Sequence, residues 1–254
     1  WTTHDGPFNF EGKYYHHRQV NIWPRPYQQP HPPVWITTGS AGSTDPVARH
    51  RHVAAIFLAG YSRVRPIFDA YRANYLKHHG EHAPLDRLAY CGLIYVGDDE
   101  KAAEKGANEL MWYMQANKVS EPWKNPPGYH PPQVAAGIMR GAHISGSGAA
   151  YSTDLKEHMR RGNVFAGTPD QVYEQIKAFW EYSGGFGHML MMGQAGFLSD
   201  ADALKSMKLY KAEVEPRLIE LAKNADPAEL WEKSKAMPVK EGVDLGNFGV
   251  EFVR

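Results

Sequence analysis

Short apolar runs that end at or near a glycine, each followed by a helical pattern, are the feature that most constrains the fold of this chain. Runs this short, and this rich in apolar or β-branched residues, predict buried strands. Strands that alternate with helices predict parallel β/α units. The pattern predicts about four strands, too few to close an eight-stranded barrel. The runs are Val34–Thr38, Ala54–Leu58, Leu88–Val96 and His188–Met192.

Helix signals flank these runs. Thr168 and Gln171 form a capping box that starts a helix ending at Gly184, and Ser199 caps a final long helix. We also expect Asp45 to cap a helix with Pro46 in its first position. Further helices are expected from about Ile67 to His79 and from Asp98 or Asp99 to about Gln115. In the final helix the apolar residues share one side: Leu204, Met207, Tyr210, Val214 and Leu218.

Three segments lack such patterns. Residues 5–33 are rich in proline and read as irregular, and residues 224–254 read as a tail without periodicity. Residues 117–151 combine several prolines and glycines, which predicts a long insertion, and a loop of this length in a compact domain is usually functional or mobile. We therefore divide the chain into a main domain, 1–222, with an insertion at about 117–151, and a C-terminal tail, 223–254.

Composition excludes several classes of function. The 28 basic residues balance 28 acidic ones, which argues against nucleic acid or a charged membrane surface as the partner. No run approaches the roughly 20 apolar residues that span a bilayer, and the first residues do not resemble a signal peptide. The single cysteine, Cys91, permits no disulfide within the chain. We expect a cytoplasmic protein.

The strongest chemical candidate is the small-residue turn Gly39–Thr44, between a strand and a helix start. Free amides at a helix start and the hydroxyls of Ser40, Ser43 and Thr44 suit a phosphate. The charge of Asp45 counts against an anion there, and an ordinary turn is the alternative. The segment is neither a P-loop nor a Rossmann fingerprint.

Other candidates have simpler interpretations. Arg63 and Arg65 follow a strand end, so they could contact an anion or remain solvated. The histidines show no metal-binding spacing, and a buried inert thiol is the default for Cys91. Trp112 and Tyr113 read as core residues on a helix. We predict no metal site.

Four segments in order resemble the bacterial-luciferase-like family of flavin-dependent oxidoreductases. The segments are Gly12–Tyr15 with Trp23–Pro33, Pro32–Thr44, Gly167–Val172, and Leu204–Tyr210 with Val214–Leu218. The resemblance covers roughly residues 8–222 and implies an α/β fold, the (β/α)8 TIM barrel. Nothing here corresponds to the family's N-terminal β/α units. We therefore expect an incomplete barrel: a fragment, a truncated gene product, or a barrel completed by another polypeptide.

By position, the resemblance implies that the flavin phosphate contacts Gly39, Ser40, Ala41, Ser43 and Thr44. In relatives the active site opens at the C-terminal ends of the strands, which implies a substrate pocket near Gly60, Tyr61, Gly193 and Gln194. In many members the catalytic histidine lies in the part that has no counterpart here. We therefore assign no catalytic residue.

The function implied is that of a monooxygenase that uses reduced FMN and O2 to oxygenate a small organic substrate. The reduced FMN would come from a flavin reductase, and a homo-oligomer is expected. One alternative is an F420-dependent oxidoreductase of the same fold. The other is a non-catalytic flavin-binding relative.

Overall fold

The computed structural model describes residues 5–116 and 154–250, so the predicted insertion lies outside the described residues. The chain divides into two compact units, residues 1–35 and 36–254. The first contains an antiparallel hairpin of β1 (Phe8–Glu11) and β2 (His16–Val20). The prediction that 5–33 is irregular was therefore wrong for these two strands, whereas residues 21–33 contain no helix or strand. Both strands are short and expose nearly all their side chains, and only β1 alternates apolar and polar residues, over the four positions Phe8–Glu11.

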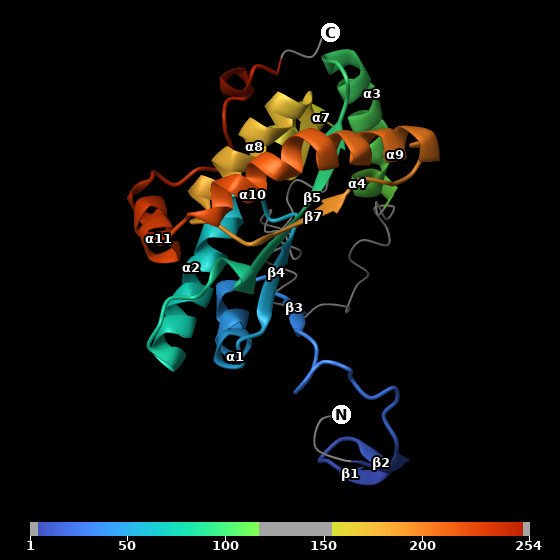
Figure 1. Ribbon diagram of the computed structural model, residues 1–254, viewed down its shortest axis with the longest axis vertical. Helices are drawn as coiled ribbons and strands as arrows, with labels where there is room; N and C mark the ends of the chain where they lie inside the picture. The colour runs from blue at the N-terminus through green and yellow to red at the C-terminus, as the bar shows by residue number, and fades with distance from the viewer. Residues whose placement is uncertain (1–4, 117–153, 251–254) are drawn as a thin grey trace, which may run out of the picture. The chain divides into compact units, whose positions relative to one another are not determined.

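The second unit is built on a five-stranded sheet whose path runs β3-β4-β5-β6, with β7 also pairing with β5 (Figure 1). β5 pairs in parallel with β4, β6 and β7. The described residues form no closed barrel, as the sequence predicted. The strands are β3 (Trp35–Thr37), β4 (Val53–Phe57), β5 (Leu88–Val96), β6 (Val164–Gly167) and β7 (His188–Met192).

Two predictions about the strands were wrong. β6 is a fifth strand that the pattern missed, because only three apolar residues precede Gly167. β3 and β7 are not buried: Ile36 and Leu190 are each 38% exposed.

Helices cover the sheet on both sides along the last half of β5. Alternate β5 residues point to opposite sides, so Tyr90 and Ile94 join one core cluster, and Leu93 and Tyr95 join the other. The first cluster includes residues of α2 and α8; the second includes residues of α3, α7 and α9. The helices are α1 (Thr44–Arg49), α2 (Gly60–His79), α3 (Glu100–Leu110), α4 (Trp112–Ala116), α7 (Leu155–Arg160), α8 (Pro169–Tyr182), α9 (Asp200–Leu209), α10 (Glu215–Lys223) and α11 (Pro227–Ala236).

The predicted helix starts are partly confirmed. Ser199 caps α9, and the N–H of Thr168 donates to Oε1 of Gln171 over 2.9 Å at the start of α8. Asp99 caps α3. Helix α2 starts at Gly60, earlier than predicted, and continues through Pro66. The described residues also form three short 3-10 helices and one π-helix: the 3-10 helices η1 (Ala41–Ser43), η2 (Leu85–Arg87) and η5 (Leu245–Phe248), and the π-helix η4 (Tyr210–Val214).

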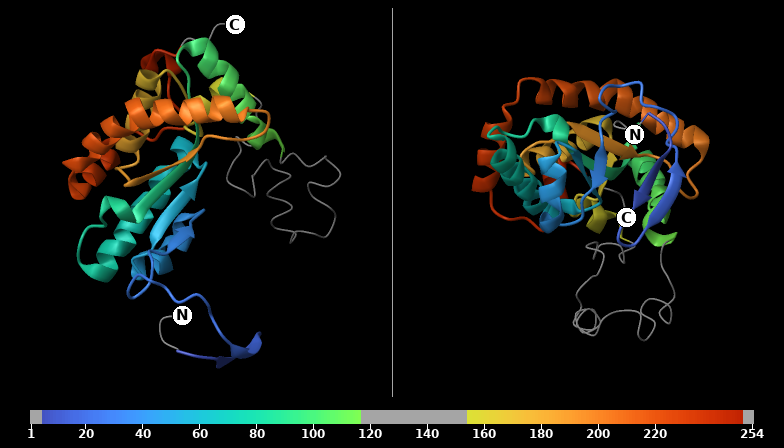
Figure 2. Two further views of the ribbon diagram at one scale, coloured as in Figure 1. Left: turned by 45° about the vertical axis from the view of Figure 1, so that its right-hand side comes forward. Right: turned by 90° about the horizontal axis from the view of Figure 1, so that it is seen from below.

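The C-terminal helices correct two further expectations. The continuous helical segment α9–η4–α10 crosses β5 (Figures 1 and 2). Of its predicted core side, Tyr210, Val214 and Leu218 belong to or pack against the core, whereas Leu204 is 54% exposed and Ala203 and Ser206 are buried instead. Residues 224–254 also contain a helix, α11, capped by Asp226, although the pattern predicted none. Its Trp231 is buried and donates to Asp69 of α2 over 2.9 Å. None of the described helices is long and apolar enough to cross a membrane.

Helix α7 carries a charge cluster that makes stability depend on pH. Glu157 accepts hydrogen bonds from Arg160 at 2.8 and 3.0 Å and from Arg161. These bonds, the one from Arg160 foremost, lower the pKa of Glu157 from 4.5 to about 2. The folded pKa lies below the unfolded one, so the ionised carboxylate stabilises the fold above about pH 4.5, and this contribution is lost as the pH falls through about 2.

We therefore expect Glu157→Gln to lower the free energy of unfolding by about 1 kcal/mol at pH 7, a value reduced for solvent screening because the cluster is partly exposed. The loss should shrink steadily between pH 5 and pH 3, because the wild-type carboxylate begins to protonate in the unfolded state. Urea unfolding of both proteins at several pH values measures this difference. A loss independent of pH would contradict the assigned charge interaction.

Candidate functional site at the carboxyl ends of β3 and β4

The turn after β3 lies beside the start of the helix after β4. The N–H of Thr38 donates to the carbonyl of Ala55 over 2.9 Å, which fixes the end of β3 against β4. Residues Gly39 to Ser43 are exposed, whereas Thr38 and Thr44 on either side are buried. The chain therefore presents a short exposed turn held at both ends.

The turn offers several hydrogen-bond donors at one place. The hydroxyls of Ser40 and Ser43 lie 3.3 Å apart, and that of Ser43 donates to the carbonyl of Ser40 over 2.8 Å. The amides of Ala41 and Gly42 open η1, where a helical turn provides no acceptor for its first N–H groups. Rotatable hydroxyls and free amides suit an anion such as phosphate.

Thr44 holds the turn in place. Its buried hydroxyl donates to the carbonyl of Ala41 over 2.7 Å and accepts from Nδ2 of Asn74 over 2.9 Å. Asn74 belongs to α2, so these two hydrogen bonds connect the turn to α2. Of the predicted hydroxyls, those of Ser40 and Ser43 face solvent and that of Thr44 does not.

Asp45 does not cap α1 as predicted; Ser43 holds the N-cap position. The Asp45 carboxylate accepts from Nε2 of His78 at 2.9 Å and pairs with Arg49 at 3.1 Å. The hydrogen bond from His78 is the main cause of a lowered pKa of Asp45. The negative charge that argued against an anion site is thus paired within the protein.

The two arginines after β4 have different surroundings. Arg63 donates to the carbonyl of Gly39 over 2.5 Å, which places its guanidinium beside the turn. Arg65 is buried, donates to the carbonyls of Ser234 and Met237, and lies over the ring of Tyr182. The expectation of a solvated charge was wrong for Arg65.

The residues predicted to line a substrate pocket differ in their exposure to solvent. Tyr61 is fully buried against Phe179 and Tyr182, which leaves it no surface for a ligand. Burial also raises the pKa of the Tyr61 hydroxyl. Gly60, beside it, has φ +64° and lies against the backbone of Arg161. At the end of β7, Gly193 is buried and Gln194 is exposed.

Of the two aromatic residues predicted to lie in the core, Tyr113 packs against the second core cluster, whereas Trp112 does not. Trp112 is 41% exposed, lies against the backbone of Gly196 and contacts Phe197 edge-on. Tyr113 is half-buried and contacts Phe57, the last residue of β4, edge-on. The spacing of Trp112 and Tyr113 on a helix carried no sign of this exposure, because the partner residues are distant in sequence.

Cysteine and histidine contribute no reactive site among the described residues. Burial raises the pKa of the Cys91 thiol to about 11, so it stays protonated at neutral pH. The described residues contain no group of three or more side chains that could hold a metal ion. These findings leave the turn after β3 as the candidate site.

A comparison with models of known protein families shows to which family this chain belongs. A family model described as luciferase-like monooxygenase matches residues 1–185. This chain belongs to the luciferase-like monooxygenase family. No curated protein matches the chain.

Solved structures agree with a luciferase-like fold. The monooxygenase RslO1 from Streptomyces bottropensis is 18% identical, with a TM-score of 0.59 over 84% of this chain and 56% of its own. The oxygenating constituent of 3,6-diketocamphane monooxygenase from Pseudomonas putida, solved with FMN, is 18% identical, with a TM-score of 0.56 over 83% of this chain and 58% of its own. The F420-dependent tetrahydromethanopterin reductase from Methanopyrus kandleri is 16% identical, with a TM-score of 0.52 over 84% and 58%.

These three structures share the fold of this chain but are longer than it. The luciferase-like chain spans between 56% and 58% of the length of these three structures. Its parallel sheet with flanking helices is the α/β fold that the sequence predicted.

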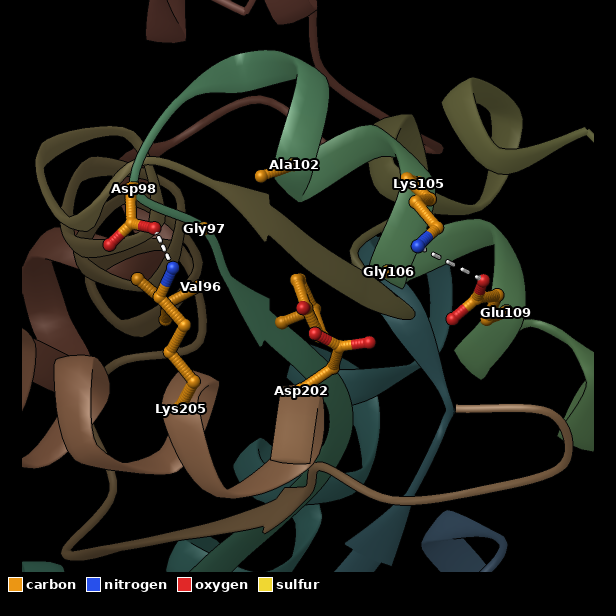
Figure 3. A pocket seen from close by; sticks show the side chains of 10 residues that line it. Val96, Gly97, Asp98, Ala102, Lys105, Gly106, Glu109, Asp202 and Lys205 are labelled. Atoms are coloured by element: carbon orange, nitrogen blue, oxygen red, sulfur yellow. Dashed lines mark hydrogen bonds and ion pairs between the residues drawn. The ribbon is translucent and has the colours of Figure 1, made fainter. Parts of the chain in front are cut away.

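A hollow in the luciferase-like domain lies elsewhere, between α3 and α9 at the end of β5 (Figure 3). Its volume is about 100 Å³. Ligand pockets of drug-sized molecules usually measure about 300–1,000 Å³, so a flavin does not fit. Four of its five charged side chains are paired with one another, Lys205 with Asp98 and Lys105 with Glu109 at 3.9 Å, and the fifth, Asp202, accepts a hydrogen bond from Ser199. We assign this hollow no ligand.

Proposed function

We propose that this chain forms part of a flavin-dependent monooxygenase that uses reduced FMN and O2 to oxygenate a small organic substrate. The observation that carries the proposal is the exposed turn Gly39–Ser43, where amides and the hydroxyls of Ser40 and Ser43 converge. When bound, reduced flavin supplies two electrons, so that one oxygen atom enters the substrate and the other leaves as water. The family relationship supports this reaction class.

The chain's own residues would bind and orient the cofactor. Ser40, Ala41 and Ser43 would donate to the phosphate, whereas Gly39 leaves space because a Cβ at that position would meet nothing within 4 Å. Thr44 would hold the turn through its bonds to Ala41 and Asn74. Fixed donors that need no rearrangement give phosphate binding at a small entropic cost.

The substrate would bind near the carboxyl ends of the strands. Gly193 and Gln194 follow β7, and Gly60 follows β4, so they border the same end of the sheet as the turn. We propose Gln194 as the polar contact among them, since its side chain is exposed. The reduced FMN would come from a flavin reductase, and the protein would act in the cytoplasm as a homo-oligomer.

An F420-dependent oxidoreductase is the second candidate. The Methanopyrus kandleri reductase has a similar fold and depends on coenzyme F420. Titration of this chain with F420 beside FMN separates the two candidates, because only the preferred cofactor should bind with a dissociation constant in the micromolar range or below.

The proposal is tested by titrating the 254-residue chain with FMN and reduced FMN while following flavin fluorescence and thermal stability. We expect saturable binding and a raised melting temperature. We expect Ser40→Ala/Ser43→Ala to weaken FMN binding by about 1–3 kcal/mol, because two hydrogen bonds to a charged group are lost.

A matched control is Ser62→Ala, a hydroxyl on the exposed side of α2. Unchanged FMN affinity in the double variant would remove the turn as the phosphate site. Saturable flavin binding by a chain that consumes no oxygen with any substrate would favour the non-catalytic flavin-binding alternative.

A further inference from the structure

Arg63 stands out because its cation lies at the candidate site without an acidic partner. Among residues 5–116 and 154–250, no carboxylate forms an ion pair with it. Its hydrogen bond goes to a neutral acceptor, the carbonyl of Gly39, at 2.5 Å. A guanidinium has five N–H donors, so this bond leaves donors for a further acceptor.

The fold explains why Arg63 reaches the turn. β4 pairs with β3, and α2 begins at Gly60, directly after the end of β4. The first turn of α2 therefore lies beside the turn after β3. Successive positions on a helix point in different directions, so Val64 and Arg65 are buried while Arg63 remains partly exposed.

The charges around Arg63 favour an anion rather than a protein carboxylate. The acidic group closest in sequence to the turn, Asp45, is already paired with His78 and Arg49. Arg65 is fully engaged with two carbonyls and the ring of Tyr182. Arg63 is thus the cation that the site can offer to a ligand.

We propose that Arg63 binds the phosphate of the flavin and makes the site selective for phosphorylated flavins over riboflavin. This inference rests on the proposed function, because it requires the phosphate at the turn Gly39–Ser43. A guanidinium and a phosphate form charge-assisted, often bidentate hydrogen bonds, which are about twice as strong as neutral ones. The amides and hydroxyls of the turn and the guanidinium of Arg63 would hold the phosphate together.

The experiment compares two ligands that differ only in the phosphate. FMN and riboflavin are titrated into the wild-type chain, Arg63→Ala, Arg63→Lys and the control Arg217→Ala, which removes an arginine of α10 that pairs with Asp170. We expect Arg63→Ala to weaken FMN binding about 10-fold to 100-fold and to change riboflavin binding less than about twofold. Arg63→Lys should recover part of the loss, since it keeps the charge but not the planar fork. Arg217→Ala should match the wild type.

Salt provides a second readout. Because an exposed charge pair is screened by ions, the FMN affinity of the wild type should fall between 50 mM and 500 mM salt more steeply than that of Arg63→Ala. Equal slopes, an unchanged FMN affinity in Arg63→Ala, or an equal loss for both flavins would overturn the role of Arg63. A wild-type chain that binds neither flavin would overturn the proposed function itself, and Arg63 with it.

Discussion

Replacing Arg72 with methionine is expected to lower the free energy of unfolding by about 4 kcal/mol, because several buried acceptors lose their donor. Arg72 is 2% exposed. It donates to the carbonyls of Ser183, Gly184 and Gly185 at 2.9, 2.8 and 2.5 Å. These carbonyls follow directly after the last residue of α8. Arg72 of α2 therefore provides hydrogen-bond donors at the C-terminus of another helix.

Arg72 stays positively charged although it is buried. Burial lowers its pKa to about 10, so the guanidinium remains ionised at neutral pH. Asp69 lies 3.7 Å away and partly compensates the charge. Methionine keeps an apolar side chain but removes the guanidinium that lies over the Phe68 ring and provides no donor, which leaves the three carbonyls and Asp69 without their cation.

Thermal and urea unfolding measure the effect. For a domain of this size the expected loss corresponds to a melting temperature about 10 °C lower. Arg72→Lys should show an intermediate loss, because an ammonium cannot reach all three carbonyls at once. Arg49→Met, at an exposed ion pair, is the control and should change stability little. A loss for Arg72→Met no larger than for Arg49→Met would show that water replaces the guanidinium at the end of α8.

Local patterns predicted the elements whose cause is local. β5 has the predicted bounds because nine consecutive residues with strand character end at Gly97. The capping box at Thr168 and the cap at Ser199 also depend on residues within one helical turn. The position of the turn after β3 was predicted for the same reason, since strand, small residues and helix start are contiguous.

Contacts between distant residues were beyond sequence reasoning. Nothing adjacent to Arg63 and Arg65 shows that one would reach Gly39 and the other Ser234. The exposure of Trp112 depends on Gly196, more than 80 residues away in the chain. Tyr61 was placed at a pocket by its position after a strand, but side-chain direction at a helix start decides burial. The sequence thus predicted the position of the turn that forms the candidate site, and only the structure showed which side chains lie beside it.

Gly60 provides the sharpest test of how that end of the sheet is built. We expect Gly60→Ala to lower the free energy of unfolding by about 3 kcal/mol, because the methyl group adds both backbone strain and a steric clash. Gly60 has φ +64°, and a Cβ there would lie 2.5 Å from the carbonyl oxygen of Arg161 and 2.8 Å from Oδ1 of Asn163. The Arg161 carbonyl already accepts from the N–H of Tyr61 over 2.9 Å, so it cannot move away freely.

Gly80 is the matched control at the other end of the same helix. It has nearly the same backbone angle, φ +68°, but a Cβ there would meet nothing within 4 Å. Gly80→Ala should therefore cost only the backbone strain, about 1 kcal/mol. The difference between the two variants in urea unfolding isolates the close approach of Gly60 to Arg161. Equal losses would mean that the neighbouring backbone relaxes, and that glycine is needed at position 60 for its backbone angle alone.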